Sequence, residues 1–295
     1  MRGEVTAFAY FPGCMAGETA REYDASIRAL ATLAGITLEE IDDWNCCGAG
    51  LVQDVDPGAA AALVRRSLDR APDGRVIVGG CPLCVARLQE VGGPKRAVHV
   101  LGIFHREDVR KKLGEKIEAT GEKRPLGSMK VACYYGRALA APALWGGGGK
   151  WPMETLAELA GASVVKWGGS RRPSGGYRLL AKPEEGFELL GKIFRDFEKS
   201  GADAIVTADP HAHFNLDSFQ YTVGRRRGRA LDVPVFHFTE LLALAMNLEG
   251  TEKWLSRHLA CPLPLIDRLV TEEEDRKRVE AKRERRELKK EKERK

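Results

Sequence analysis

The stretch Arg75–Cys84 reads RVIVGGCPLC and passes from a short apolar run, through two glycines, to two cysteines three positions apart. The apolar run predicts a buried strand, and the Cys-x-x-Cys lies at the strand-to-helix junction that follows it. Strands and helices alternate on both sides of this stretch, with strand candidates at Val5–Phe11, Thr37–Ile41 and Arg75–Val78 and helical stretches at Glu18–Ala34 and Ala59–Arg70. This alternation is typical of βαβ units with a mainly parallel sheet.

Cysteines follow each of these three strand candidates. They are Cys14, the pair Cys46–Cys47, and Cys81 with Cys84. Because ligand sites in parallel sheets gather at the carboxyl ends of the strands, we expect these thiols to meet at one edge. Thiolates favour iron–sulfur clusters, zinc or copper(I). Five sulfurs are one more than a cubane cluster or a zinc ion needs, although a zinc site and a set of buried thiols stay open as alternatives.

The same order of motifs returns in the second half of the chain, so the sequence predicts a duplication of one α/β unit. Strand candidates at Lys130–Tyr135 and Ala202–Thr207 stand in place of Val5–Phe11 and Arg75–Val78. In the first half 31 residues separate Cys14 from Cys46 and 33 separate Cys47 from Cys81, and the aligned intervals of the second half are 35 and 34. The five aligned positions of the second copy carry no thiol; they are Arg137, Pro173, Ser174, Asp209 and Ala212.

The residues around the cysteines resemble a known family. Tyr10–Cys14, Cys46–Gly48 and Cys81–Cys84 read YFPGC, CCG and CPLC, which is similar to the cysteine-rich CCG domain. Over residues 5–250 the chain resembles the B subunit of heterodisulfide reductase, which carries two such domains in tandem. Asn215–Asp217 of the second copy resembles the Asn-Leu-Asp that follows the Cys-Pro-x-Cys of that family.

The resemblance implies a cofactor and a class of reaction. It implies one non-cubane [4Fe-4S] cluster, built from two fused iron–sulfur units, on Cys14, Cys46, Cys47, Cys81 and Cys84. In the family, paired clusters cleave a disulfide and each holds one sulfur of the substrate. Since the second copy lacks thiols, we expect a single cluster that acts on a thiol, disulfide or related sulfur group. The implied partners are other subunits of a heterodisulfide-reductase-like complex and a small sulfur-containing substrate or carrier.

The second copy carries polar residues where the thiols are missing. Candidates for an anionic-substrate pocket or a partner-docking surface are Arg137, Asp209 and His211, with Arg171 and Arg172 beside them. The two adjacent arginines are equally typical of a solvated loop. The motif Asp-Pro-His-Ala-His over 209–213 can also be interpreted as a hard-metal site. A histidine at position 213 is common in the family, so we expect no second metal there.

Four other features receive no chemical role. Cys133 is expected to be a buried thiol inside a strand, and Cys261 has no partner nearby. The run Gly146–Gly149 lacks the following Lys-Ser/Thr of a phosphate-binding loop and predicts a turn. The arginines of Arg225–Arg229 predict a solvated loop or a contact with an acidic partner.

The net charge of +5 belongs mostly to the C-terminus. From Arg276 onward there are 12 basic and 5 acidic residues, and the rest of the chain holds 35 basic and 37 acidic ones. The body therefore has no basic character, and we expect no nucleic-acid partner. The tail Glu272–Lys295 has strong helix formers but no apolar face, which predicts a solvated, partly helical extension or a partner-docking segment.

The remaining composition limits the compartment and the electron source. Seven cysteines without an export signal are typical of metal or redox chemistry in a reducing, cytoplasmic setting. No apolar run approaches the length of a membrane span. No flavin or nicotinamide motif is present, so we expect electrons to come from, or go to, another chain.

The sequence thus predicts two related parallel-sheet units in tandem and a charged helical tail, with boundaries at 1–104, 128–250 and 251–295. We expect an oxidoreductase, an iron–sulfur redox subunit of a heterodisulfide-reductase-like complex. The alternatives are an electron-relay or assembly subunit with a structural cluster or zinc, and an iron–sulfur subunit of a lactate or glycolate oxidation complex.

Overall fold

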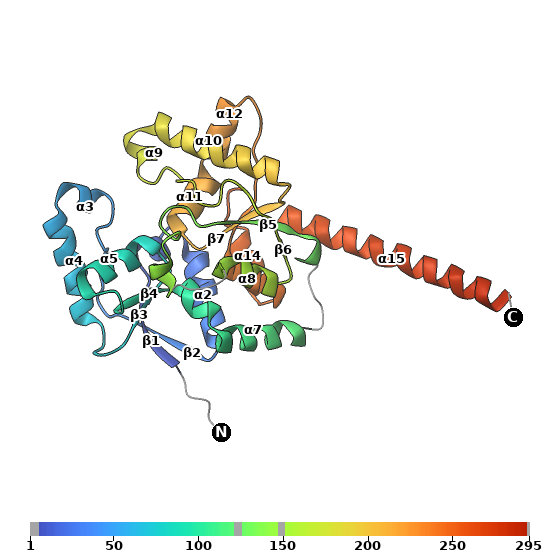
Figure 1. Ribbon diagram of the computed structural model, residues 1–295, viewed down its shortest axis with the longest axis horizontal. Coiled ribbons are helices and arrows are strands. Elements are labelled where there is room, and N and C mark those ends of the chain that lie inside the picture. Colours follow the sequence, from blue (N-terminus) through green and yellow to red (C-terminus); the bar gives the residue numbers. More distant parts are fainter. Residues whose placement is uncertain (1–5, 121–125, 147–150, 294–295) are drawn as a thin grey trace, which may run out of the picture.

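The computed structural model describes residues 6–120, 126–146 and 151–293. It contains two four-stranded sheets in which every strand pair is parallel (Figure 1). The first sheet has the order β2-β1-β3-β4, formed by Ile36–Glu40, Thr6–Phe11, Ile77–Gly79 and Ala97–His99. The second has the order β6-β5-β7-β8, formed by Ser163–Val164, Lys130–Tyr134, Ala204–Thr207 and Val235–His237. The predicted fold class, two related parallel-sheet units, is confirmed.

The helices of the first unit connect and cover its strands. They are α1 (Cys14–Gly17), α2 (Arg21–Leu33), α3 (Leu51–Val55), α4 (Pro57–Arg70), α5 (Pro82–Gly92), α6 (Val100–His105) and α7 (Glu107–Ala119). Helix α4 begins two residues earlier than its apolar pattern predicts, because the Asp56 side chain accepts a hydrogen bond from Ala59 N and Pro57 occupies the first turn.

The helices of the second unit connect its strands in the same way and continue into the C-terminal tail. They are η1 (Leu126–Ser128), η2 (Pro142–Trp145), α8 (Pro152–Leu159), α9 (Arg178–Ala181), α10 (Pro183–Ser200), α11 (Pro210–Ser218), α12 (Gln220–Arg226), α13 (Phe238–Ala245), α14 (Thr251–Leu255) and α15 (Leu263–Glu293).

Some elements differ from the sequence-based expectation. Between the two predicted units, 1–104 and 128–250, the chain forms helix α7, which buries Val109 and Leu113 against the core. The strands β4, β6 and β8 have only two or three residues, too few for a periodic pattern to reveal them. Of the predicted Gly146–Gly149 turn, residues 147–149 lie outside the described residues.

The two units share one hydrophobic core across their junction. Helix α2 of the first unit packs on α13 of the second, where Ser26 Oγ lies 2.7 Å from Thr239 Oγ1. The rings of Phe104 and Phe238 meet edge to face with centroids 5.8 Å apart, and both are fully buried. Aromatic pairs of this geometry stabilise beyond their buried area. This packing fixes how the loops of the two units face each other.

Helix α15 begins at Leu263, before the predicted tail Glu272–Lys295, contains that tail as far as Glu293, and extends away from the body of the molecule (Figure 1). Leu265, Ile266 and Leu269 bury its first turns in the core. Farther along, Arg283 pairs with Glu287 one turn away at the solvent-exposed surface, and Val279 is 66% exposed. No helix among the described residues is long and apolar enough to cross a membrane.

Candidate metal centre

The loops after β1, β2 and β3 bring the five predicted cysteines to one edge of the first sheet. Cys14 begins α1 just after β1, and Cys81 is the residue before the first turn of α5, just after β3. Gly13 has φ +78°, a conformation that favours glycine, and a Cβ there would lie 3.1 Å from Cys84 Sγ. The chain therefore needs glycine at this position to approach the sulfurs so closely.

The five thiols are free and contact one another. Cys47 Sγ lies 3.4 Å from Cys84 Sγ, and Cys14 with Cys46, Cys46 with Cys47, and Cys81 with Cys84 also interact. Cys47, Cys81 and Cys84 are buried, whereas Cys14 and Cys46 are exposed. The structure thus brings together every cysteine that the sequence singled out at this edge. The group has a buried inner side and a side that is open to solvent.

The contacts among the thiols shift their pKa values in opposite directions. Hydrogen bonds from Cys14 and Cys47 lower the pKa of Cys46, and the same contact with Cys46 raises the pKa of Cys14 and of Cys47. A hydrogen bond from Cys84 lowers the pKa of Cys81, while Cys47 and Cys81 raise the pKa of Cys84. Cysteine binds metals through its thiolate, and sulfur is a soft ligand. Five cysteine sulfurs that lie together therefore suit a soft metal centre.

Side chains of the second unit cover part of this thiol group. The Tyr177 hydroxyl donates a hydrogen bond to the Ala49 carbonyl at 3.3 Å, and the tyrosine ring lies against Gly50. The His211 ring interacts with Cys81, and its centroid lies 5.7 Å from that of the Tyr177 ring. Sequence reasoning gave Tyr177 no role, although it aligns with Gly50, the residue that it contacts. The alignment of the two copies already paired Tyr177 with Gly50, but only the fold shows that these two residues are in contact.

The candidate residues of the second unit occupy different positions relative to the thiols. Asp209 is buried and its carboxylate accepts a hydrogen bond from His211 N at 2.9 Å, which caps helix α11. Burial and the charge of Cys81 raise the pKa of Asp209 to about 6. Burial lowers the pKa of His211, but the contact with Cys81 and the charge of Asp209 outweigh it and raise this pKa to about 9. Arg137 is exposed.

Several arginines of the second unit that the sequence singled out pair with other side chains. Arg171 stacks over the Trp151 ring at 4.8 Å, and Arg172 pairs with Asp196. Within the run expected to be a solvated loop, Arg226 pairs with Glu184, and Arg227 pairs with Glu198 at 2.6 Å. Because Arg225 and Arg226 also belong to α12, this part of the loop prediction was wrong.

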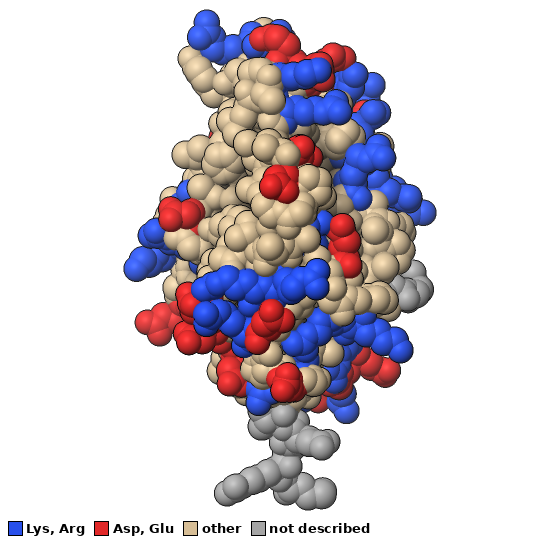
Figure 2. Space-filling view, turned by 90° about the vertical axis from the view of Figure 1, so that its left-hand side faces the viewer, with Lys and Arg blue, Asp and Glu red and all other residues tan. Residues whose placement is uncertain are grey.

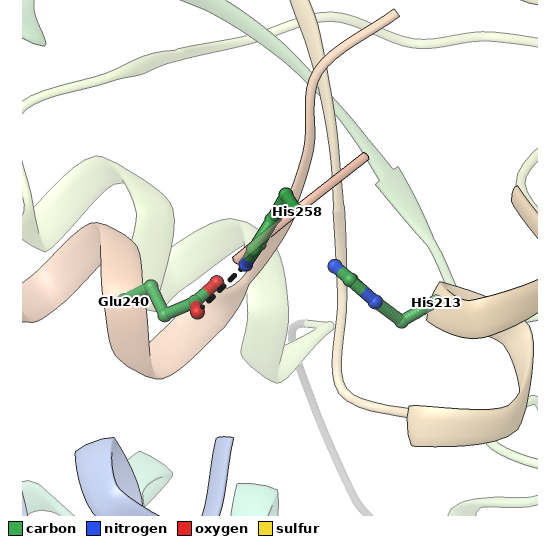
Figure 3. Close-up of side chains that lie close together, drawn as sticks. All are labelled: His213, Glu240 and His258. Atoms are coloured by element: carbon green, nitrogen blue, oxygen red, sulfur yellow. Dashed lines mark hydrogen bonds and ion pairs between the residues drawn. The ribbon is translucent and has the colours of Figure 1, made fainter. Parts of the chain in front are cut away.

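The motif over 209–213 does not converge on one point. His211 faces Cys81, whereas His213 Nε2 lies 2.9 Å from the Val235 carbonyl. His213 instead lies beside Glu240 and His258, and the three side chains point toward one another from separate elements (Figure 3). His258 Nε2 is 2.9 Å from a Glu240 carboxylate oxygen, and His258 Nδ1 is 2.8 Å from the Val235 carbonyl. Hydrogen bonds within the protein therefore satisfy this buried group.

The other two cysteines take no part in the thiol group. Cys133 is buried in β5, as expected, and burial raises its pKa. Cys261 is partly exposed before α15, with Sγ 3.9 Å from the Leu255 carbonyl.

The first unit matches a known domain family. Residues 8–89, which include all five thiols of the group, match the cysteine-rich domain CCG. The chain contains a CCG cysteine-rich domain. In the CCG domain the matched residues run from β1 into α5, so they include each loop that contributes a thiol.

Three known proteins to which the chain is similar are subunits of reductases. The chain is 27% identical over 273 residues to the 8-methylmenaquinol:fumarate reductase membrane anchor subunit of Wolinella succinogenes, covering 85% of this chain and 96% of that protein. It is 28% identical over 190 residues to the B subunit of the ferredoxin:CoB-CoM heterodisulfide reductase of Methanosarcina mazei, covering 61% and 59%. The predicted resemblance to the B subunit of heterodisulfide reductase is thereby confirmed over part of the chain.

Two further comparisons extend this result. The B subunit of a ferredoxin/F(420)H(2)-dependent CoB-CoM heterodisulfide reductase from Methanosarcina acetivorans is 27% identical over 175 residues, 56% of each chain. A structure of a hypothetical protein from Helicobacter pylori superposes with a TM-score of 0.61 at 9% identity, covering 88% of this chain and 52% of that one. The latter likeness concerns the fold alone.

Proposed function

We propose that this protein is an iron–sulfur redox subunit of a heterodisulfide-reductase-like complex. The observation that carries the proposal is the convergence of five free thiols, three buried and two exposed, inside the CCG domain. Cys14, Cys46, Cys47, Cys81 and Cys84 would hold one non-cubane [4Fe-4S] cluster. Such a cluster supplies one-electron chemistry for a thiol, a disulfide or a related sulfur group.

The residues around the proposed cluster would have different roles. Cys47, Cys81 and Cys84 form the dry side of the site, where a low dielectric strengthens every interaction with the thiolates. Cys14 and Cys46 lie at the open side, which is where a small sulfur-containing substrate or carrier would approach. Arg137, Asp209 and His211 stay candidates for contacts with that substrate or with a partner.

Electrons would pass between this chain and other subunits of the complex. Beside the thiol group, Leu51 and Val55 of α3 and Leu180 of α9 are 64%, 80% and 74% exposed. The face of the molecule that carries α3 and α9 has a broad uncharged band between charged margins (Figure 2). Exposed apolar surface with a polar rim is typical of a protein–protein contact. We place the complex in the cytoplasm, as the sequence predicts.

A second function, electron relay without sulfur chemistry, is favoured by one comparison. One relative, whose match covers 85% of this chain, is the membrane anchor subunit of an 8-methylmenaquinol:fumarate reductase. In addition, Arg137 and Asp209 stand where a second cluster would need thiols. A relay or assembly subunit, and a subunit of a lactate or glycolate oxidation complex, would use the same single cluster. A zinc ion on four of the thiols is the remaining alternative.

Metal analysis of the anaerobically purified chain tests the cluster. We expect about four iron and four sulfide per chain for a [4Fe-4S] centre, with an electron paramagnetic resonance signal in one redox state. Cys81→Ser should lose the iron, and the matched control Cys133→Ser, at the buried thiol of β5, should keep it. One zinc without sulfide, or equal iron in both variants, would reject the proposal.

Turnover then separates sulfur chemistry from relay. The chain purified with its native partner subunits is given an aromatic disulfide or a persulfide and a reduced dye as the electron donor. Thiol release that depends on the cluster supports the proposed chemistry. Reduction of the cluster without thiol release supports the relay function.

A further inference from the structure

The second unit contributes two side chains to the thiol group of the first, although it has no thiol at its own aligned positions. Tyr177 comes from the loop before α9 and His211 from the first turn of α11. In the first unit the residues aligned with them are Gly50 and Leu83. A polar ring at either position is therefore not required to build the α/β unit itself.

Packing from both sides holds these two rings in place. The Tyr177 ring fills the space above Gly50 so closely that a Cβ on Gly50 would lie 2.0 Å from a ring carbon. The Tyr177 hydroxyl is tied to the Ala49 carbonyl, two residues after Cys47. His211 is fixed at its backbone by the Asp209 carboxylate and lies edge to face with Tyr177. The ring of His211 is thus directed at Cys81 by its neighbours.

Three buried histidines of the region have other partners, and the ring nitrogens of a fourth, His237, have no hydrogen-bond partner among the described residues. His99 Nε2 lies 2.8 Å from the Gly80 carbonyl, His213 Nε2 lies 2.9 Å from the Val235 carbonyl, and His258 pairs with Glu240. His211 is the histidine whose ring contacts a thiol of the group. A hydrogen bond to a buried sulfur of an iron–sulfur centre is one of the means by which a protein sets the reduction potential.

We propose that His211 is a positioning residue of the second unit that donates an N–H hydrogen bond to the Cys81 sulfur and raises the reduction potential of the bound cluster, with Tyr177 closing this side of the site to water. The inference rests on the proposed function, since it concerns the cluster on Cys81. Reduction adds negative charge to the centre and its sulfur ligands. A hydrogen-bond donor stabilises this more negative state, because charge-assisted hydrogen bonds are stronger than neutral ones.

Two variants at position 211 test this role. His211→Leu removes the donor and introduces the residue that the first unit has at the aligned position, Leu83. His211→Gln keeps a side-chain N–H. The control His105→Phe changes a partly exposed histidine at the end of α6, where the backbone carbonyl of His105 accepts from Arg110. The full chain is purified anaerobically, and iron content is measured before an electron paramagnetic resonance titration of the potential.

We expect His211→Leu to keep its iron. At a given potential, the ratio of reduced to oxidised cluster should shift about tenfold toward the oxidised form, so the reduction potential of this one-electron couple should be about 59 mV lower than in the wild type. His211→Gln and His105→Phe should stay at the wild-type potential. An unchanged potential in His211→Leu, or an equal shift in His211→Gln, overturns the inference while the proposed function stands.

Loss of iron is covered by the same set of variants. If His211→Leu binds no iron, full iron and the wild-type potential in His211→Gln support the donor role, and loss of iron in both variants overturns it. Wild-type chain without iron overturns the proposed function and this inference together. Tyr177→Leu gives an independent readout, because opening the site should speed the loss of the signal in air.

Discussion

The buried pair His258–Glu240 predicts that the folded protein loses stability as the pH rises through the weakly alkaline range. The side chains of His258 and Glu240 are 1% and 0% exposed, and their nearest atoms are 2.9 Å apart. Burial opposes a charged imidazole, but the charge and hydrogen bond of Glu240, with smaller effects of Asp217 and Glu22, raise the pKa of His258 to about 9. The perturbation to test is Glu240→Gln, which removes the charge and keeps the shape.

The size and the sign of the effect follow from linkage between protonation and folding. The ordinary histidine pKa is about 6.5, so a folded-state value of about 9 corresponds to about 3 kcal/mol of unfolding free energy. Because the pKa is raised on folding, this stability is fully present below pH 6.5 and is lost as the pH rises through about 9. Burial lowers the pKa of His213 and of His237, so these neighbours stay neutral across that range.

Urea unfolding under reducing, anaerobic conditions at several pH values from 6 to 10 measures the prediction. Thiols also titrate in this range, so the quantity to compare is the difference between wild type and Glu240→Gln, in which their contribution cancels. This difference should shrink by about 3 kcal/mol between the two ends of the range. The control Glu184→Gln, at an ion pair whose Glu184 side chain is 79% exposed, should show a difference that does not change with pH.

A gap between wild type and Glu240→Gln that stays constant from pH 6 to 10 would refute the reasoning. It would mean that His258 is neutral in the folded protein and that the pair is an ordinary hydrogen bond. A gap that widens with pH would reverse the sign and would contradict the assignment of the charge to the imidazole.

Two further predictions concern the frame around the site. Gly102→Ala in α6 should destabilise the protein by about 1–3 kcal/mol in thermal or urea unfolding, because the new Cβ would lie 2.2 Å from the Trp145 carbonyl oxygen. In the control Gly17→Ala the new Cβ would have no packing neighbour within 4 Å among the described residues, so the stability should not change. A stable Gly102→Ala variant would show that η2 can move away from α6. Truncation after Lys277 should change the melting temperature by no more than about 1–2 °C, since the buried residues of α15 precede it, and a larger drop would reveal a contact of the tail with the body.

Local patterns in the sequence predicted much of the frame. The apolar run before Gly79 and the repeated intervals between motifs predicted β1, β3, β5 and β7 and the parallel order, because strand burial and turn chemistry depend on neighbouring residues. The sequence did not predict helix α7, because its two buried residues, Val109 and Leu113, are too few to form a periodic apolar face among charged residues. It did not predict the strands β4 and β8, because three residues are too few to show the alternation of a strand.

The sequence by itself determined which residues form the thiol group. Spacing along the chain places Cys14, Cys46, Cys47, Cys81 and Cys84 after strands, and the carboxyl ends of parallel strands meet at one edge. The duplication also showed which ligand positions the second unit lacks. Neither result needs knowledge of how the two units pack.

Only the tertiary structure decided what the second unit does at this edge. The contact of α2 with α13 and the edge-to-face rings of Phe104 and Phe238 set how the units face each other. That orientation brings Tyr177 onto Gly50 and His211 onto Cys81. Contacts between residues more than a hundred positions apart depend on the packing of whole helices, and no local pattern of the sequence contains that information.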